Sequence, residues 1–406
     1  MPLGKNDWSA GGMPSAYFYG KTGDTMNQKR KVLYIASTFG HLASFHQPYL
    51  EWFAEQGYIV HAAAGGEACE LPGVSRYIPL PFEKAMFSPA NVKAAFQLRH
   101  VLREERYALV SLHTSLAAFF ARLSVRMLGK NRPVVMNTAH GYLFDQDTPQ
   151  PKRSILLQAE RMTASVTDWL LTMNQQDEVI ANRYRLGKRI VPTHGMGVDM
   201  ERFRRPTEAR RSAARKKLGL RSDEVALVYA AEFSGRKNQA MLIRAMRKLP
   251  ENLVLFLPGT GALLESCREL AQETGVAQRI YFPGFVRDME TYYQAADICV
   301  SASRSEGLPF NIMEAMACGL PVVASDVKGH QDLIQSGENG FLYPYDDSDA
   351  FASAVVQLMR EQERCKMGER VQASVAPYDI KNVFPELTAL YRKALESDGA
   401  AKTRRM

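Results

Sequence analysis

Two glutamates, Glu306 and Glu314, flank a predicted turn between a strand over 297–301 and a short helix. Pro309 near the start of that helix and Gly319 just past its end are typical boundary residues. A helix N-terminus presents free backbone N–H groups and a partial positive charge, so it can bind a diphosphate. The carboxylates beside it can accept hydrogen bonds from the vicinal hydroxyls of a ribose or a sugar. The alternative is a glutamate that only stabilises the helix dipole. The agreement of strand, turn and helix signals favours binding.

A pair of cations, Arg236 and Lys237, lies in a loop that follows a predicted strand over 225–231. Positive charge at the end of a strand can stabilise a diphosphate leaving group as its negative charge develops. On this segment alone, a solvated basic loop is an equal alternative.

The N-terminal half offers two further candidates at the ends of predicted strands. Gly40 follows the strand over 32–37, and a glycine there lets the backbone approach a ligand closely. His140 follows the strand over 133–138, where an imidazole can hydrogen-bond a sugar hydroxyl or manage a proton. A plain turn and a structural histidine are the alternatives. His113 is assigned to packing or to support of the site.

Composition excludes several classes of protein. The chain has 406 residues, of which 46% are hydrophobic and 23% charged, and its 5 cysteines form no C-x-x-C pair. These values are typical of a globular protein and argue against a disulfide scaffold and a cysteine zinc site. No apolar run reaches the roughly 18 residues that a membrane span needs. We therefore expect a cytoplasmic protein.

Short apolar runs alternate with helical segments from residue 31 onward, which predicts parallel sheets covered on both faces. The predicted strands cover 32–37, 58–64, 108–113, 133–138 and 168–173, then 225–231, 252–257, 279–282, 297–301, 321–325 and 341–343. Predicted helices in the first half cover 45–56, 91–105 and 116–128. The sequence therefore predicts an α/β protein with two Rossmann-like doubly wound domains that face each other across a ligand-binding cleft.

A polar, arginine-rich stretch interrupts this alternation and sets the domain boundaries. We predict a disordered N-terminal extension (1–28), an N-terminal domain (29–200), a linker (201–222), a C-terminal domain (223–378) and a final helix and tail (379–406) that packs back on the N-terminal domain.

The segment over 306–323 reads E-G-x-P-x-x-x-x-E-A-M-A-x-G-x-P-V-V. It resembles the corresponding segment of the family 4 glycosyltransferases, which are retaining enzymes of the GT-B fold with nucleotide-sugar donors. The resemblance extends over about 31–395. It implies an N-terminal acceptor domain and a C-terminal donor domain.

The resemblance also implies roles for the candidate residues. Glu306 would contact the donor sugar near the reacting carbon, together with His140 and Lys237 as the other catalytic residues. Glu314 would hold the ribose hydroxyls. The remaining donor contacts would come from Gly40, Arg236, Phe285, Val286, Gly307, Leu308, Pro309 and Phe310.

One departure from the family pattern concerns the basic loop. The family usually has Gly-Arg where this chain has Ala231 and Glu232. We expect Lys237 to keep its role and Arg236 to substitute for the missing arginine.

The resemblance implies transfer of a sugar to a glycan or polyprenyl-diphosphate-linked acceptor in capsule, exopolysaccharide or O-antigen biosynthesis. The donor would be UDP-linked, as is common in the family. Two alternatives stay open: a nucleotide-sugar-binding partner subunit without turnover, and a nucleotide-sugar epimerase on the same fold. We expect no cofactor and no essential metal, because the D-x-D pair Asp145 and Asp147 lies in a Pro/Gln-rich loop. Nucleic-acid binding is not expected, since no reader motif is present.

Charge and apolar residues in the N-terminal half suggest a surface contact. Residues 1–200 contain 22 Lys and Arg against 16 Asp and Glu, within a net charge of +8. Lys84, Met86 and Phe87 precede a helix that carries Lys93, Arg99 and Arg103, with Arg106 just beyond it. Basic and apolar side chains together can seat a protein on anionic lipid. Peripheral attachment to the inner face of the plasma membrane is the resulting hypothesis.

Overall fold

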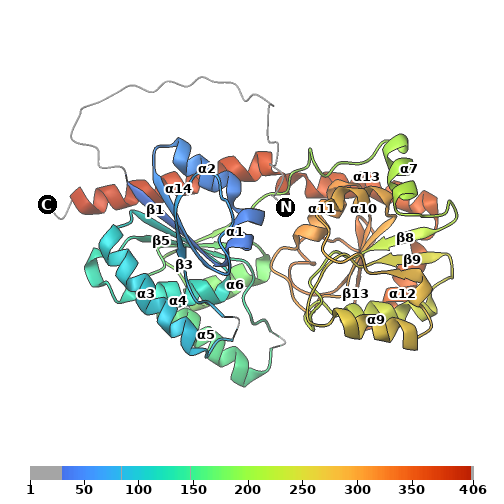
Figure 1. Cartoon of the computed structure of the whole chain (residues 1–406), viewed down its shortest axis with the longest axis horizontal. Helices are drawn as coiled ribbons and strands as arrows, with labels where there is room; N and C mark the ends of the chain where they lie inside the picture. The colour runs from blue at the N-terminus through green and yellow to red at the C-terminus, as the bar shows by residue number, and fades with distance from the viewer. Residues whose placement is uncertain (1–29, 84, 147, 404–406) are drawn as a thin grey trace.

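The chain forms two α/β domains, each built on a parallel sheet, in the computed structural model (Figure 1). The structure describes residues 30–83, 85–146 and 148–403. The predicted extension over 1–28, Lys84 and Asp147 lie outside these ranges. Within them, no helix combines the length and the apolar character that crossing a bilayer requires.

The N-terminal sheet has 7 strands in the order β3-β2-β1-β4-β5-β6-β7. The chain starts in the middle and winds first to one edge, then to the other, so the switch point lies between β1 and β4. The strands are β1 (Lys31–Thr38), β2 (Ile59–Gly65), β3 (Val74–Pro79), β4 (Leu109–His113), β5 (Val134–Ala139), β6 (Trp169–Thr172) and β7 (Arg189–Pro192).

Helices cover both faces of this sheet because alternate strand residues point to opposite sides. Leu33 and Ile35 pack with residues of α3 (Pro89–Glu105) and α4 (Ser115–Arg126). Val32 and Tyr34 pack with residues of α1 (Phe39–Phe45) and α2 (Gln47–Glu55). The remaining helices of this domain are α5 (Gln150–Ala164) and α6 (Gln175–Tyr184).

Several elements differ from the sequence prediction. The edge strands β3 and β7 are not predicted, because both contain exposed residues and lack a continuous apolar run. The predicted helix over 45–56 is interrupted at His46, just before Pro48, which has no N–H to continue a helix. Helix α5 is also missed; its Pro151 lies in the first turn, where proline is tolerated.

The C-terminal sheet has 6 strands in the order β10-β9-β8-β11-β12-β13. The strands are β8 (Val225–Val228), β9 (Leu253–Phe256), β10 (Ile280–Tyr281), β11 (Ile298–Ser301), β12 (Val322–Ser325) and β13 (Gly340–Tyr343). Its helices are α8 (Gln239–Ala245), α9 (Leu264–Glu273), α10 (Met289–Ala295), α11 (Phe310–Ala317), α12 (Ser348–Gln357) and α13 (Glu361–Val375). The switch point lies between β8 and β11.

The predicted linker over 201–222 contains a helix, α7 (Glu208–Lys217), that packs against α10. Arg211 and Arg215 form ion pairs with buried Asp297 at 2.8 and 3.2 Å. These pairs attach α7 to the C-terminal domain, so this part of the predicted linker packs on that domain. The arginines mark a packed helix.

The final helix α14 (Ile380–Thr403) runs beside the N-terminal domain (Figure 1). The Tyr391 ring lies 5.0 Å from that of Phe53, and the Tyr391 hydroxyl is 3.1 Å from the Ser111 hydroxyl. Through these contacts the end of the chain connects the two domains.

Candidate active site between the two sheets

The two domains contact each other at the carboxyl ends of their sheets. Gly307 lies so close to the turn after β5 that a Cβ atom on it would be 2.1 Å from the carbonyl oxygen of His140. Gly141 has a φ of +103°, and a Cβ on it would be 2.8 Å from the Gly307 Cα. The Asn174 amide donates to the Gly307 carbonyl at 3.1 Å. Positions 141 and 307 therefore require glycine, and His140 is adjacent to the turn that carries Glu306.

Glu306 is buried and pairs with both cations of the loop between β8 and α8. Its Oε1 accepts a hydrogen bond from Lys237 Nζ at 2.5 Å, and its Oε2 accepts one from Arg236 Nη1 at 3.0 Å. Burial favours a higher pKa for this carboxyl, but the charges of Lys237 and Arg236 outweigh burial and lower the pKa to about 2. Glu306 is therefore ionised at physiological pH and joins two predicted site segments into one charge cluster.

Glu314 lies in α11, half-buried and in a different electrostatic setting. Its Oε2 accepts a hydrogen bond from the Tyr293 hydroxyl at 3.0 Å. Burial raises the pKa of Glu314 to about 7, against the smaller lowering effect of that hydrogen bond. Two carboxylates eight positions apart thus differ in protonation near neutral pH, because the charges of Lys237 and Arg236 dominate at Glu306 and burial dominates at Glu314.

The start of α11 follows the predicted turn. Pro309 is the N-cap residue of α11, Leu308 is buried, and Gly319 adopts a φ of +81° after the helix. The Phe310 ring lies 4.5 Å from that of Phe45, in α1 of the other domain. The helix N-terminus therefore faces the N-terminal domain.

The remaining predicted donor contacts lie at the ends of other strands. Phe285 is 74% exposed and Val286 is half-buried, in the loop between β10 and α10. Gly40 lies in the first turn of α1, and a Cβ on it would meet nothing within 4 Å. Packing within the protein therefore does not require glycine at position 40, and the space beside it is open.

His140 belongs to a group of imidazoles at the end of the N-terminal sheet. Its Nε2 lies 3.1 Å from His113 Nδ1, and His113 Nε2 lies 2.9 Å from the Ser111 hydroxyl. Burial lowers the pKa of His140 to about 3, and the charge of His41 adds to this effect. His113, predicted either to pack or to support the site, is fully buried and contacts His140 directly.

The sequence reasoning misses a buried ion pair across the domain contact. Lys328, in the loop after β12, is 3% exposed; its Nζ lies 2.9 Å from Asp177 Oδ1 and donates to the Tyr142 carbonyl at 2.7 Å. A single lysine in a loop gives no sequence signal for such a role. Only the approach of the two domains buries it.

Replacing Lys328 with methionine should destabilise the protein by about 3–5 kcal/mol, because Asp177 would remain buried without its cation. Urea unfolding at pH 7 measures the loss. Lys366→Met is the matched control, since Lys366 forms an exposed pair with Glu363 and should change stability by less than about 1 kcal/mol. Equal stability of the two variants would contradict the importance of the buried pair.

Comparison with known proteins identifies the family. The family model described as Glycosyl transferases group 1 matches residues 210–373, and the model described as Glycosyltransferase Family 4 matches residues 49–203. The Bacillus subtilis (strain 168) protein EpsD, which is named for a glycosyltransferase activity, is 34% identical over 379 residues, covering 92% of this chain and 99% of that protein. The chain belongs to the family 4 glycosyltransferases.

Two other proteins extend the comparison. The UDP-Gal:alpha-D-GlcNAc-diphosphoundecaprenol alpha-1,3-galactosyltransferase of Escherichia coli is 26% identical over 275 residues, which are 66% of this chain and 70% of that protein. The structure of sucrose-phosphate synthase from Thermosynechococcus elongatus superposes with a TM-score of 0.75 at 22% identity, covering 91% of this chain and all of that one. With the two parallel sheets described above, this confirms the predicted GT-B fold. The protein is a glycosyltransferase of this fold.

Proposed function

We propose that this glycosyltransferase moves a sugar, with retention of configuration, from a nucleotide diphosphate sugar to a glycan or polyprenyl-diphosphate-linked acceptor. The observation that carries the proposal is the cluster that buried Glu306 forms with Lys237 and Arg236 at the contact with the His140 turn. This cluster places opposite charges beside the N-terminus of α11, where a sugar diphosphate separates charge as its bond breaks.

The proposed mechanism follows from these charges. Cleavage of the bond between sugar and diphosphate leaves positive character on the sugar and negative charge on the phosphate. Lys237 and Arg236 stabilise the leaving phosphate, and the Glu306 carboxylate stabilises the sugar cation. The departing phosphate then takes the acceptor proton on the same face, which retains the configuration. Because Glu306 is paired with two cations, it acts by position and charge and need not form a covalent bond.

Domain contact completes the proposed site. His140 donates a hydrogen bond to a hydroxyl of the donor sugar, and the approach of Gly307 to the His140 carbonyl keeps water from the reacting carbon. Glu314 accepts hydrogen bonds from the ribose hydroxyls. We take UDP as the first donor to test, because the Escherichia coli relative is named for a UDP-Gal donor.

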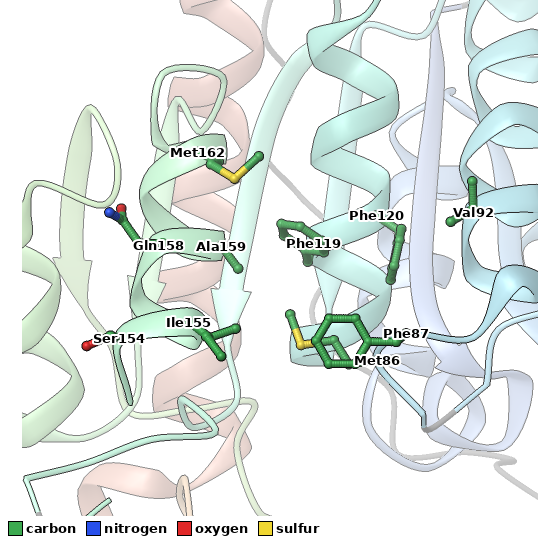
Figure 2. Close-up of a pocket in the computed structure, with 10 residues that line it drawn as sticks. All are labelled: Met86, Phe87, Val92, Phe119, Phe120, Ser154, Ile155, Gln158, Ala159 and Met162. Carbon is green, nitrogen blue, oxygen red and sulfur yellow. The ribbon is translucent and has the colours of Figure 1, made fainter. Parts of the chain in front are cut away.

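A lipid-linked acceptor is supported by an apolar groove in the N-terminal domain (Figure 2). The groove has a volume of about 590 Å³ and lies between α4, α5 and the loop before α3. Its lining residues include Met86, Phe87, Val92, Phe119, Ile155 and Met162. The same Escherichia coli relative is named for a diphosphoundecaprenol acceptor, which has an apolar tail of the kind this groove fits.

A panel of nucleotides and nucleotide sugars tests the donor assignment. UDP and UDP-sugars should raise the melting temperature, since a ligand at about 100 times its Kd adds about 2.7 kcal/mol of stability. Glu314→Ala should abolish this rise in melting temperature. Glu265→Ala, which removes an exposed side chain on α9, should retain it. No shift with any nucleotide, in protein shown to be folded, would overturn the proposed function.

The same binding should depend on pH through Glu314. Its pKa of about 7 means that the carboxyl is mostly protonated at pH 6 and mostly ionised at pH 8. The ionised form accepts two hydroxyl hydrogen bonds, so nucleotide affinity should rise by up to about tenfold between these pH values. Titration calorimetry at both pH values measures the ratio. Glu314→Gln should bind with an affinity that no longer changes; a pH dependence retained in this variant would assign the effect to another group.

Membrane attachment is proposed through the face that surrounds the groove. Phe87, Val92 and Phe96 are 84%, 48% and 57% exposed. Val92, Phe96, Arg99 and Arg103 follow one another at spacings of four, three and four residues on α3, which places apolar and basic side chains on one stripe.

The protein should therefore float with vesicles that contain anionic lipid, and Phe87→Asp should reduce the floating fraction several-fold. Val356→Asp, at an apolar side chain 46% exposed in α12 of the other domain, is the matched control and should leave flotation unchanged. Binding that is absent, or that salt does not weaken, would contradict attachment by charge and apolar contact.

A further inference from the structure

Four histidines gather at the carboxyl edge of the N-terminal sheet, from segments far apart in the sequence. His41 lies in α1, His46 between α1 and α2, His113 at the end of β4, and His140 after β5. The ring centroid of His41 is 5.2 Å from that of His46 and 5.2 Å from that of His140, and the His46 and His140 centroids are 5.6 Å apart. Three imidazoles therefore surround one small space.

Several ring nitrogens around this space lack a hydrogen-bond partner among the described residues. His46 is fully buried, and neither of its ring nitrogens has a hydrogen-bond partner in the part of the chain that the structure describes. The buried Nε2 of His41 also has no partner there. Buried polar atoms are nearly always hydrogen-bonded or bound to an ion, so this arrangement indicates a ligand that the protein itself does not supply.

The spacing of the nitrogens suits a metal ion. One nitrogen from each of His41, His46 and His140 lies within 4.8 Å of the other two. In a tetrahedral zinc site with Zn–N distances of about 2.0–2.1 Å, neighbouring ligand nitrogens are about 3.4 Å apart. His41 and His140 are half-buried, so rotation of their side chains can close this difference. His113 contacts Nε2 of His140, so Nδ1 of His140 remains available for the ion.

We propose that His41, His46 and His140 bind one divalent transition-metal ion, with Zn²⁺ the best fit. Imidazole ligands suit Zn²⁺, whereas Mg²⁺ and Mn²⁺ prefer carboxylate and carbonyl oxygens, and no carboxylate belongs to this group of ligands among the described residues. Three protein ligands leave a fourth position for water or an oxygen of a bound molecule. With Nδ1 on the ion, His140 carries its proton on Nε2 and donates it to His113 Nδ1, which orients the ring as outer-shell partners of metal ligands do.

Ion binding does not depend on the proposed transferase function, but one consequence does. If His140 contacts the donor sugar, an ion that engages His140 competes with that contact. Zn²⁺ should then inhibit sugar transfer, and chelation should restore it. The cluster is then an inhibitory site beside the reaction centre, and the ion that it binds takes no part in sugar transfer.

Calorimetric titration of the chelator-treated full-length protein with ZnCl₂ tests the proposal. We expect one ion per chain and an affinity at least about 100-fold weaker in His41→Ala, which removes one half-buried ligand and leaves the core intact. His100→Ala is the matched control, because His100 is an exposed histidine on α3, and it should bind as the wild type does. Unchanged melting temperatures of both metal-free variants confirm folding.

Titration with CoCl₂ identifies the ligands independently. A tetrahedral cobalt spectrum without thiolate charge-transfer bands supports the histidine site. A thiolate band would place the ion on exposed Cys69 or Cys365 and overturn the proposal. The absence of one-to-one binding, or equal affinities of His41→Ala and the wild type, would overturn it as well.

Discussion

Glu306→Gln should lower kcat by about two to three orders of magnitude, with little change in nucleotide affinity. Glutamine keeps the shape of the side chain but removes the charge that faces Lys237, Arg236 and the developing sugar cation. The nucleotide is expected to bind mainly through the α11 N-terminus and Glu314, which the substitution does not alter. The rate of UDP release from the donor that the nucleotide panel identifies measures the effect.

The variant also changes stability, so the two effects have to be separated. Lys237 is 12% exposed at its side chain and would lose its carboxylate partner, at a cost of up to about 3 kcal/mol. Assays well below the variant's melting temperature keep it folded. Glu338→Gln, which removes an exposed carboxylate paired with Arg370, should leave kcat within twofold. A folded Glu306→Gln enzyme with wild-type kcat would disprove the role of this charge.

The interior of both sheets could be predicted from the sequence, because strands buried on both faces contain continuous apolar runs. The runs over 32–37 and 297–301 match β1 and β11 within about two residues. Edge strands such as β3 contain exposed residues instead of a continuous apolar run and give a weaker signal. Helix α7 was not predicted for another reason. Its arginine-rich sequence is typical of a solvated linker, and only the structure shows that these arginines pair with Asp297.

The sequence predicts those parts of the candidate site that lie within one segment, but not the contacts between segments that are far apart in the chain. Glu306, Glu314 and the start of α11 lie in one continuous segment, whose turn and helix the sequence predicts directly. The pairing of Glu306 with Lys237 depends on β8 and β11 being neighbours in the sheet, which the motif does not contain. The cluster around His46 requires three strand ends to converge and could not be found from spacing. Lys328 depends on the contact between two domains.

Gly307→Ala should also slow sugar transfer strongly, because Gly307 lies at the contact between the two domains. The new Cβ would lie 2.1 Å from the His140 oxygen and 2.5 Å from its carbonyl carbon, both of them backbone atoms. The domains must therefore separate by about 1 Å, and a displacement of this size at a reaction centre costs about 100-fold in rate. Glu314 and its contact with Tyr293 are not affected, so the UDP-induced thermal shift should persist while UDP release slows.

Comparison with a second glycine substitution isolates the domain contact as the cause of this loss. Gly275 has a φ of +72° and open space around its Cα, so Gly275→Ala strains the backbone without a clash between domains. It should lose about 1 kcal/mol of stability and keep its rate. If Gly307→Ala slows the reaction and Gly275→Ala does not, the approach of Gly307 to His140 is part of the catalytic arrangement. Equal rates in both variants would show that the reaction proceeds without this contact, and the role of His140 in holding the donor sugar would fail with it.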